Sequence, residues 1–183
     1  MQFADLYQSL SQDAQTRAKK IKLLICDIDG VFSDGRIYLG NQGEELKAFN
    51  TKDGFGIKAL INSGIEVAVI TGRHSHIVQQ RMTSLTVKYI YQGQENKLQA
   101  YQELKDSLAL TDDEIAYIGD DGPDLPVMEQ VGFAVAVNDA HPLIKRIAHY
   151  TTLLPGGFGA VRELTDLLML ENGVSLTTDG SSS

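Results

Sequence analysis

The feature that most constrains the fold is a regular alternation of short apolar segments with segments of helical periodicity. Expected strands cover residues 21–26, 65–70, 87–91, 115–119 and 133–137. Expected helices cover residues 54–62, 74–85, 96–108, 123–131, 142–148 and 160–170. This alternation is typical of right-handed βαβ units, in which helices cover both faces of a parallel sheet. The sequence therefore predicts an α/β protein with one parallel sheet in one domain.

The alternation occupies residues 21–171, which we expect to form the domain. Residues 1–20 carry only a weak helical stripe of apolar side chains, which is typical of a mobile N-terminal arm. Residues 172–183 are polar and end in Gly-Ser-Ser-Ser, which predicts a disordered tail. Two short extended segments flank residues 40–43, so we expect a β-hairpin over residues 35–49.

Composition restricts the class of protein. The chain is 43% hydrophobic and 22% charged, as in ordinary globular domains. Its one cysteine, Cys26, allows no disulfide framework, which favours a reducing compartment. We expect no signal peptide, because no cationic segment precedes an apolar run. No apolar stretch approaches the ~20 residues that cross a bilayer, so we expect a cytoplasmic protein without a membrane partner.

The formal net charge of −8 gives no electrostatic footprint for nucleic acid. It also disfavours a small anionic substrate, unless basic side chains converge on one site.

Polar side chains gather where the expected strands end. Asp27 and Asp29 follow the first strand, Thr71 the second and Asp120 the fourth, while Lys97 opens the helix after the third. An aspartate after a strand is usually a turn or cap residue, and a lysine at a helix start is usually solvated. In open α/β sheets, however, ligands bind beyond the carboxyl ends of the strands. The conjunction therefore predicts one functional site.

These residue types suit metal-assisted phosphoryl transfer. Asp27 and Asp120 can supply oxygens to Mg²⁺, and Asp27 can also attack phosphorus to form an aspartyl phosphate. Asp29 can serve as general acid and then as general base. Lys97 and the Thr71 hydroxyl can stabilise the charge on the transferring phosphoryl group.

The motifs Asp27-Ile28-Asp29-Gly30, Thr71-Gly72-Arg73, Lys97 and Gly119-Asp120-Asp121 with Asp124 resemble the four motifs of the haloacid dehalogenase superfamily, in their usual order. The resemblance implies a Rossmann-like fold, with Asp27 as nucleophile and Asp29 as acid/base. It implies Mg²⁺ bound by Asp27, the main-chain carbonyl of Asp29 and Asp120. Asp121 and Asp124 would support these ligands without binding the metal themselves. Residues 30–52 leave room for a hairpin flap but not for a cap domain, since units below ~40 residues rarely fold alone. We therefore expect a capless phosphatase.

Longer strings, at residues 29–35, 44–54, 91–97 and 156–163, are similar to the family of 3-deoxy-D-manno-octulosonate 8-phosphate phosphatases. This resemblance implies a homotetrameric enzyme that releases phosphate from a precursor of bacterial lipopolysaccharide. It places substrate contacts at Asp29, Asn50, Thr51, Lys52, Asp53, Gly54, Lys58, Arg73, Arg81 and Lys97. The basic members of this set would offset the acidic net charge. One departure is Gly122-Pro123, where bulkier residues are expected, and it leaves the shape of that loop open.

Alternatives remain open from the sequence. The substrate could be another sugar-acid phosphate, such as a nonulosonate 9-phosphate. A phospho-receiver signalling module also uses acids, a threonine and a lysine at strand ends, but it opens with adjacent acids, whereas here the spaced pair comes first. A catalytically silent regulatory module is a third reading, although every acid that the chemistry needs is present.

The hairpin carries Ile37, Tyr38, Leu39, Leu46 and Phe49, too much apolar surface for an isolated two-stranded unit. We expect it to pack against a neighbouring subunit and cover the site, with folding back onto its own domain as the alternative. The glycine-rich segment 156–159 reads as packing between a strand and a helix, or as part of a mobile lid from that neighbour together with the tail.

Overall fold

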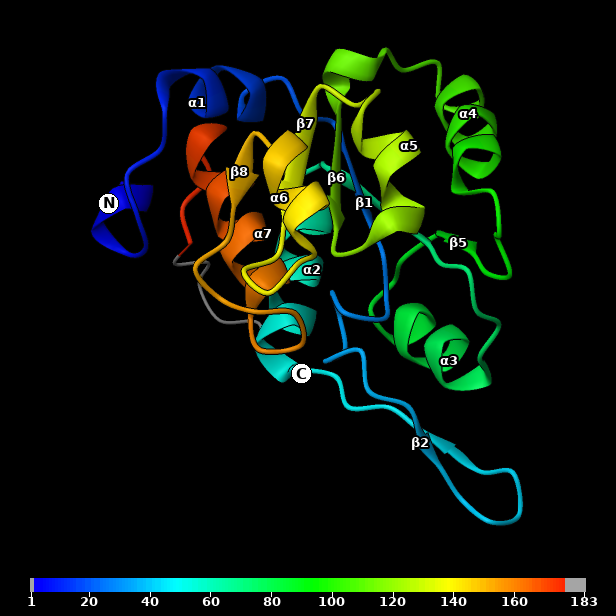
Figure 1. Cartoon of the computed structure of the whole chain (residues 1–183). Coiled ribbons are helices and arrows are strands. Elements are labelled where there is room, and N and C mark those ends of the chain that lie inside the picture. The colour runs from blue at the N-terminus through cyan, green and yellow to red at the C-terminus, as the bar shows by residue number, and fades with distance from the viewer. Residues whose placement is uncertain (1, 177–183) are drawn as a thin grey trace.

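The computed structural model describes residues 2–176 and contains a six-stranded parallel sheet (Figure 1). The strand order is β5-β4-β1-β6-β7-β8, and each neighbouring pair runs parallel. The strands are β1 (Leu23–Cys26), β4 (Glu66–Ile70), β5 (Tyr89–Tyr91), β6 (Ile115–Gly119), β7 (Phe133–Ala136) and β8 (Tyr150–Thr151). The predicted α/β fold is therefore confirmed. The sequence missed β8, because two residues are too few for a periodic signal.

Helices cover the sheet in two layers (Figure 1). α2 packs against α7, and α1 joins that layer, while α4 packs against α5 in the other. The α-helices are α1 (Gln12–Ala18), α2 (Thr51–Asn62), α3 (His76–Ser84), α4 (Lys97–Ser107), α5 (Leu125–Met128), α6 (Pro142–Ile147) and α7 (Ala160–Glu171). The 3₁₀ turns are η1 (Phe3–Asp5), η2 (Asp112–Glu114) and η3 (Gly122–Asp124). The single helix predicted at 123–131 is wrong, since two prolines, which lack an N–H, divide that region into η3 and the short α5.

The central strands are buried on both faces. Every side chain of β1, β6 and β7 is buried, as expected where helices cover both sides of a parallel sheet. Parallel strands direct their carboxyl ends to one edge. The loops that follow β1, β4 and β6 therefore meet there.

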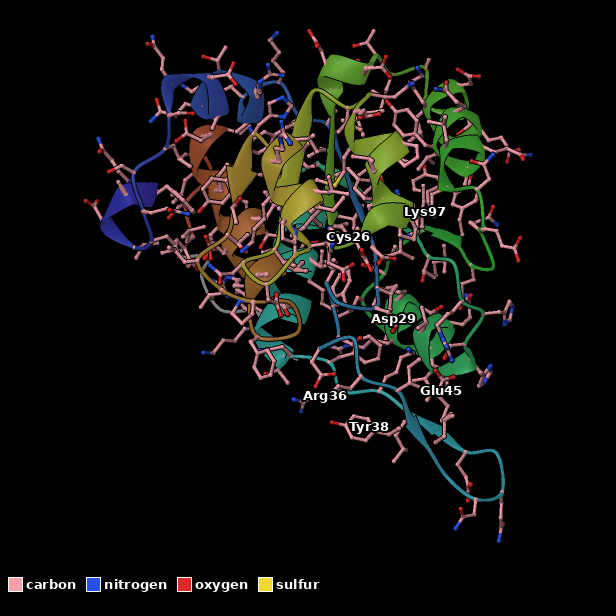
Figure 2. The ribbon with its side chains drawn as sticks, viewed as in Figure 1. Cys26, Asp29, Arg36, Tyr38, Glu45 and Lys97 are labelled. Atoms are coloured by element: carbon pink, nitrogen blue, oxygen red, sulfur yellow. The ribbon has the colours of Figure 1, made fainter. Side chains whose placement is uncertain are left out.

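The predicted hairpin forms from β2 (Tyr38–Leu39) and β3 (Glu45–Leu46), with Tyr38 opposite Leu46. It projects from the body of the domain, and Tyr38 lies out along it (Figures 1 and 2). Leu39 is 72% exposed and Leu46 is 66% exposed, so these side chains do not fold back onto their own domain. Between β1 and α2 the structure has no other helix or strand, which agrees with the capless prediction.

The segment predicted as a mobile N-terminal arm packs against the domain instead. Phe3 is buried, stacks on Tyr7 and meets the edge of Tyr150. The Tyr7 hydroxyl donates a 2.8 Å hydrogen bond to Asp166 on α7. The buried faces of η1 and α1 hold this segment, and a short helical stripe in the sequence could not reveal a partner surface more than a hundred residues away.

Of the predicted disordered tail, residues 172–176 are described. The Val174 amide donates a 2.8 Å hydrogen bond to the Met169 carbonyl, and Val174 and Leu176 pack against the core. Residues 177–183, the rest of that prediction, lie outside the described residues. Within residues 2–176 no helix is both long and apolar enough to span a bilayer.

Candidate active site

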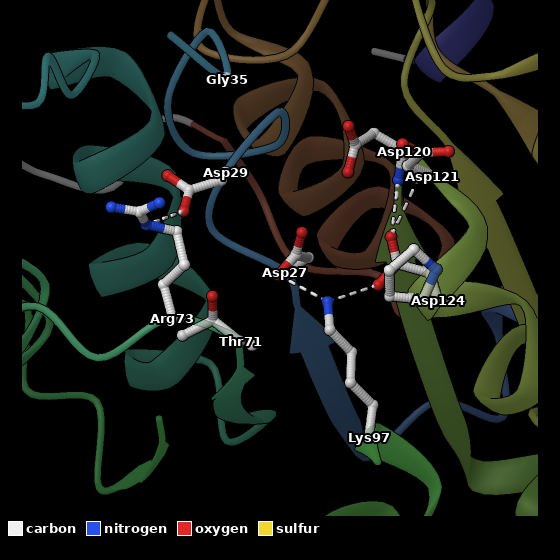
Figure 3. A pocket seen from close by; sticks show the side chains of 11 residues that line it. Asp27, Asp29, Gly35, Thr71, Arg73, Lys97, Asp120, Asp121 and Asp124 are labelled. Atoms are coloured by element: carbon white, nitrogen blue, oxygen red, sulfur yellow. Dashed lines mark hydrogen bonds and ion pairs between the residues drawn. The ribbon is translucent and has the colours of Figure 1, made fainter. Parts of the chain in front are cut away.

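A pocket of about 300 Å³ opens at the edge of the sheet where the carboxyl ends of the strands meet (Figure 3). The loops after β1, β4 and β6 and the first residue of α4 form its wall. Its lining is Asp27, Asp29, Gly35, Thr71, Gly72, Arg73, Lys97, Asp120, Asp121, Pro123 and Asp124. The lining contains all the charged and hydroxyl-bearing residues of the predicted motifs: Asp27, Asp29, Thr71, Arg73, Lys97, Asp120, Asp121 and Asp124.

Asp27 and Lys97 form a buried ion pair at the floor of the pocket. The Lys97 ammonium lies 2.7 Å from Asp27 Oδ1 and 2.7 Å from Asp124 Oδ1 (Figure 3). Burial, followed by the neighbouring carboxylate of Asp124, raises the pKa of Asp27 to about 6. Burial alone would lower the pKa of Lys97, but Asp27 and Asp124 outweigh it and raise that pKa. The lysine therefore stays protonated beside the carboxylate.

Asp120 brings a second carboxylate next to Asp27. Burial and then the charge of Asp27 raise the pKa of Asp120 to about 8. Carboxylate oxygens of Asp27, Asp120 and Asp124 lie within 4.8 Å of one another. Crowded carboxylates of this kind are the hard oxygen ligands that Mg²⁺ takes. The residues present therefore fit a divalent cation.

Asp124 is occupied by other partners. Its Oδ1 accepts hydrogen bonds from Lys97 at 2.7 Å and from the Tyr117 hydroxyl at 2.6 Å. Its Oδ2 accepts the backbone amides of Asp120 at 2.9 Å and Asp121 at 3.3 Å. Asp124 thus holds Lys97 and the loop that bears Asp120, while Asp27 and Asp120 are left to face a cation.

Gly30 allows this approach of the two loops. Its φ is +92°, and a Cβ there would lie 2.1 Å from Asp120 Oδ2. Any side chain at this position would displace Asp120, and a positive φ already favours glycine. The glycine after the Asp27/Asp29 pair is thus a steric requirement of the site.

The glycine-rich segment 156–159 packs against the loop of its own chain. A Cβ on Gly156 would lie 1.7 Å from the Gly30 carbonyl oxygen, and the Gly157 amide donates a 2.8 Å hydrogen bond to the Val31 carbonyl. The Gly156 amide donates to Asp139 at 2.9 Å. These contacts agree with the packing reading of the segment, and its role in a lid over a neighbour's site stays a prediction.

The Asp29 carboxylate has three hydrogen-bond or ion-pair partners, and the sequence analysis had not predicted two of them, Ser33 and Lys47. Its Oδ1 accepts from Ser33 at 3.3 Å and from the Lys47 ammonium, and its Oδ2 lies 3.8 Å from Arg73. Glu45 completes the group by pairing with Lys47 and Arg73. The available signal was the period of two in the strand, which places Glu45 and Lys47 on one face.

Seven predicted substrate contacts lie outside the described lining of this subunit's pocket: Asn50, Thr51, Lys52, Asp53, Gly54, Lys58 and Arg81. The Asn50 side chain accepts the Lys52 amide at 2.9 Å and caps α2. Asp53 is fully buried and accepts the Arg162 amide at 2.8 Å, at the first turn of α7. Lys52 and Lys58 are exposed, and a Cβ on Gly54 would lie 2.4 Å from the Arg81 guanidinium.

The departure at Gly122-Pro123 leaves the loop compact. Asp121 caps η3 by accepting the Gly122 amide at 2.7 Å, and Pro123 occupies an early position of the turn, where a missing N–H costs nothing. The loop keeps Asp120 and Asp124 in place.

Fold and pocket together define a hydrolase of the haloacid dehalogenase type. A family model described as haloacid dehalogenase-like hydrolase matches residues 88–155. The chain is also 56% identical to the 3-deoxy-D-manno-octulosonate 8-phosphate phosphatase of Yersinia pestis over 164 residues, which cover 90% of this chain and 88% of that protein. The chain belongs to the family of 3-deoxy-D-manno-octulosonate 8-phosphate phosphatases, so the phospho-receiver alternative is excluded.

Solved structures agree with this family. The crystal structure of the Yersinia pestis phosphatase superposes with a TM-score of 0.90 at 54% identity and covers 91% of this chain and 90% of that one. A Moraxella catarrhalis phosphatase, solved in complex with magnesium, phosphate and the free sugar acid, superposes with a TM-score of 0.86 at 40% identity, covering 88% of this chain and 92% of that one.

Proposed function

We propose that this chain hydrolyses 3-deoxy-D-manno-octulosonate 8-phosphate to the free sugar acid and phosphate, in the synthesis of a lipopolysaccharide precursor. The observation that carries the proposal is Asp27 at the end of the central strand, with Lys97 on one side and Asp120 on the other. Identity above one half over nine-tenths of the chain supports the choice of substrate.

The residues divide the reaction into two displacements. An Asp27 oxygen bonds to phosphorus while the bond to the sugar oxygen breaks, and Asp29 gives that oxygen its proton. Asp29 then takes a proton from water as the water oxygen bonds to phosphorus and the bond to Asp27 breaks. Asp27, Asp120 and the Asp29 carbonyl would hold Mg²⁺, which would supply positive charge to the phosphoryl oxygens. Lys97 and the Thr71 hydroxyl contribute to the same charge stabilisation.

A phosphate-release screen tests the substrate. Wild-type protein with Mg²⁺ is offered 3-deoxy-D-manno-octulosonate 8-phosphate, a nonulosonate 9-phosphate and simple hexose phosphates, and kcat/KM is compared. The octulosonate ester should give the highest value, and Asp27→Asn should give none. A higher value for the nonulosonate ester would contradict the assignment and favour the alternative substrate.

We also propose that a second copy completes the site and that the assembly is a homotetramer. The projecting hairpin exposes Leu39 and Leu46, and Phe55 and Phe158 are exposed on the body, and contact with a second copy would bury these apolar side chains. Lys52 and Lys58 do not line the pocket of their own subunit. In the assembly they would reach the carboxylate of a substrate bound in the pocket of the neighbouring subunit.

Two measurements test the assembly. Sedimentation should give a tetramer, and a fully active monomer would refute the idea. Lys58→Met and Asp27→Asn proteins are then mixed, because a hybrid pocket would combine an intact Asp27 with an intact Lys58 from the neighbour. Activity above the mean of the two separate variants is expected once subunits exchange, and strict additivity would refute the role of Lys58 across subunits.

We place the enzyme in the cytoplasm. The proposal is supported by its one cysteine, Cys26, which is buried and forms no disulfide. Expression with a compartment-specific tag and cell fractionation would test it, and recovery in the periplasm would contradict it.

A further inference from the structure

Four side chains of alternating charge form a closed ring beside the pocket. The Lys47 ammonium pairs with Asp29 and lies 3.3 Å from Glu45. Arg73 lies 3.4 Å from the same Glu45 and 3.8 Å from Asp29. Figure 2 shows Asp29 at the body of the domain and Glu45 toward the hairpin. The ring therefore joins the loop after β1, the hairpin strand β3 with the residue after it, and the loop after β4.

Lys47 is the unusual member of the ring. Its side chain is 0% exposed, although apolar side chains of the adjoining hairpin, such as Leu39 and Leu46, face water. A surface lysine would normally extend its ammonium into solvent, and lysines are almost never fully buried unless paired. Here the ammonium is turned inward, onto the acid/base.

The hairpin geometry explains why Lys47 reaches Asp29. Side chains alternate along a strand, so Glu45 and Lys47 share one face and Leu46 takes the other, where it is 66% exposed. The polar face of this strand turns toward the pocket. Ser33 supports the same Asp29 oxygen as Lys47, at 3.3 Å, and Arg73 holds the other oxygen.

We propose that Lys47 is a positioning residue for catalysis, which fixes the Asp29 carboxylate in the orientation needed for both proton transfers and ties it to the hairpin. This proposal rests on the proposed function and on Asp29 as its acid/base. Lys47 touches neither of the groups that bond to phosphorus, and it acts through Asp29. A displacement of about 1 Å in a catalytic group can cost about 10²-fold in rate, which sets the scale of the effect.

The test compares Lys47→Met, which keeps length and removes charge, with Lys47→Arg, which keeps charge. On 3-deoxy-D-manno-octulosonate 8-phosphate, Lys47→Met should lower kcat by about 10²-fold with little change in KM, and Lys47→Arg should recover most of the loss. A loss confined to KM, or no loss, would overturn the proposal.

Leaving-group dependence separates positioning of Asp29 from general damage. A sugar alkoxide needs a proton to depart, whereas p-nitrophenolate does not. In rapid-mixing experiments Lys47→Met should slow the release of the sugar much more than the first burst of p-nitrophenolate from p-nitrophenyl phosphate. Equal slowing of both would refute the assignment.

Lys105→Met is the matched control. Lys105 also has a largely covered side chain and pairs with Asp112 at 2.9 Å, but away from the pocket lining. The Lys105→Met and Lys47→Met proteins should have similar Tm values, and Lys105→Met should keep the wild-type kcat.

The failure of the proposed function can be told apart from the failure of this inference. A wild type that rejects the octulosonate ester yet hydrolyses another alkyl phosphate would refute the proposed function alone, and the Lys47 comparison would be made on that ester. A wild type inert toward all phosphate esters would refute both.

Discussion

The Tyr117 hydroxyl donates a 2.6 Å hydrogen bond to Asp124 Oδ1, the same oxygen that receives the Lys97 ammonium. Tyr117 is a fully buried residue in the middle of β6, and its phenol is the only polar part of that side chain. A buried tyrosine hydroxyl needs a partner. Here the partner is the carboxylate that orients Lys97 against Asp27, so an apparent core residue supports the site.

Tyr117→Phe should therefore lower both stability and activity. Loss of a hydrogen bond to a charged group should reduce the free energy of unfolding by about 1–3 kcal/mol. With Lys97 less firmly held, kcat should fall while KM changes little. Urea unfolding and steady-state kinetics measure the two effects. Tyr101→Phe is the control, since its hydroxyl donates to Asp112 at the amino end of β6, and it should lose stability without losing kcat.

Asp27→Asn should abolish turnover while the protein stays folded, because the carboxylate that attacks phosphorus is gone. Substrate carrying ³²P, quenched with acid during a single turnover, should leave label on wild-type protein and none on the variant. Absence of labelled protein at every time point would contradict the aspartyl phosphate.

Asp29→Asn should slow turnover by about 10²–10⁴-fold, the usual contribution of a general acid/base. Because an amide cannot give or take the proton, both half-reactions should slow. Quench-flow measurement of sugar release and of dephosphorylation checks this. A variant that slowed only one half-reaction would show that another group serves in the other.

Metal removal should inactivate the enzyme. EDTA should abolish activity and Mg²⁺ should restore it, whereas Ca²⁺ should compete without supporting turnover, because its looser shell misplaces the ligands. Mg²⁺ should also raise Tm of the wild type, since it relieves repulsion between Asp27 and Asp120, and should raise it much less in Asp120→Asn. Full activity after exhaustive chelation would refute this prediction.

Asp53 should make stability fall as pH rises through the weakly acidic range. Burial raises its pKa from 3.8 to about 6. Between these values the folded protein keeps a proton that the unfolded chain has lost, so this contribution is present below about pH 4 and is lost above about pH 6. Asp53→Asn cannot titrate. The free energy of unfolding of Asp53→Asn minus that of wild type should therefore become more positive by up to about 3 kcal/mol between pH 4 and pH 7. Urea unfolding at each pH measures this difference. A difference that is constant with pH would contradict the assignment.

The site chemistry was readable in the sequence because it depends on chain order. Asp27 with Asp29, Thr71 and Asp120 each follow a buried strand, and parallel strands must end at one edge of the sheet. The residue types alone then indicate a nucleophile, an acid/base and a cation site. Gly30 is part of the same local pattern, although the reason for it, the approach of Asp120, lies in another loop.

Contacts that only tertiary packing creates could not be read in this way. Asp53, a predicted substrate contact, accepts the Arg162 amide in the first turn of α7, because α2 and α7 pack together in the fold. Phe3 was expected in an arm and is buried against Tyr7 and Tyr150.

Periodicity and strand order thus determined the sheet, the edge that carries the pocket and the groups that we propose to act on phosphorus, since these follow from local pattern and chain direction. The ring that joins Asp29 to Lys47 was decided only in three dimensions. Its members come from three separate loops and strands. The period of two places Glu45 and Lys47 on one face of the strand, but it does not say that this face turns toward Asp29.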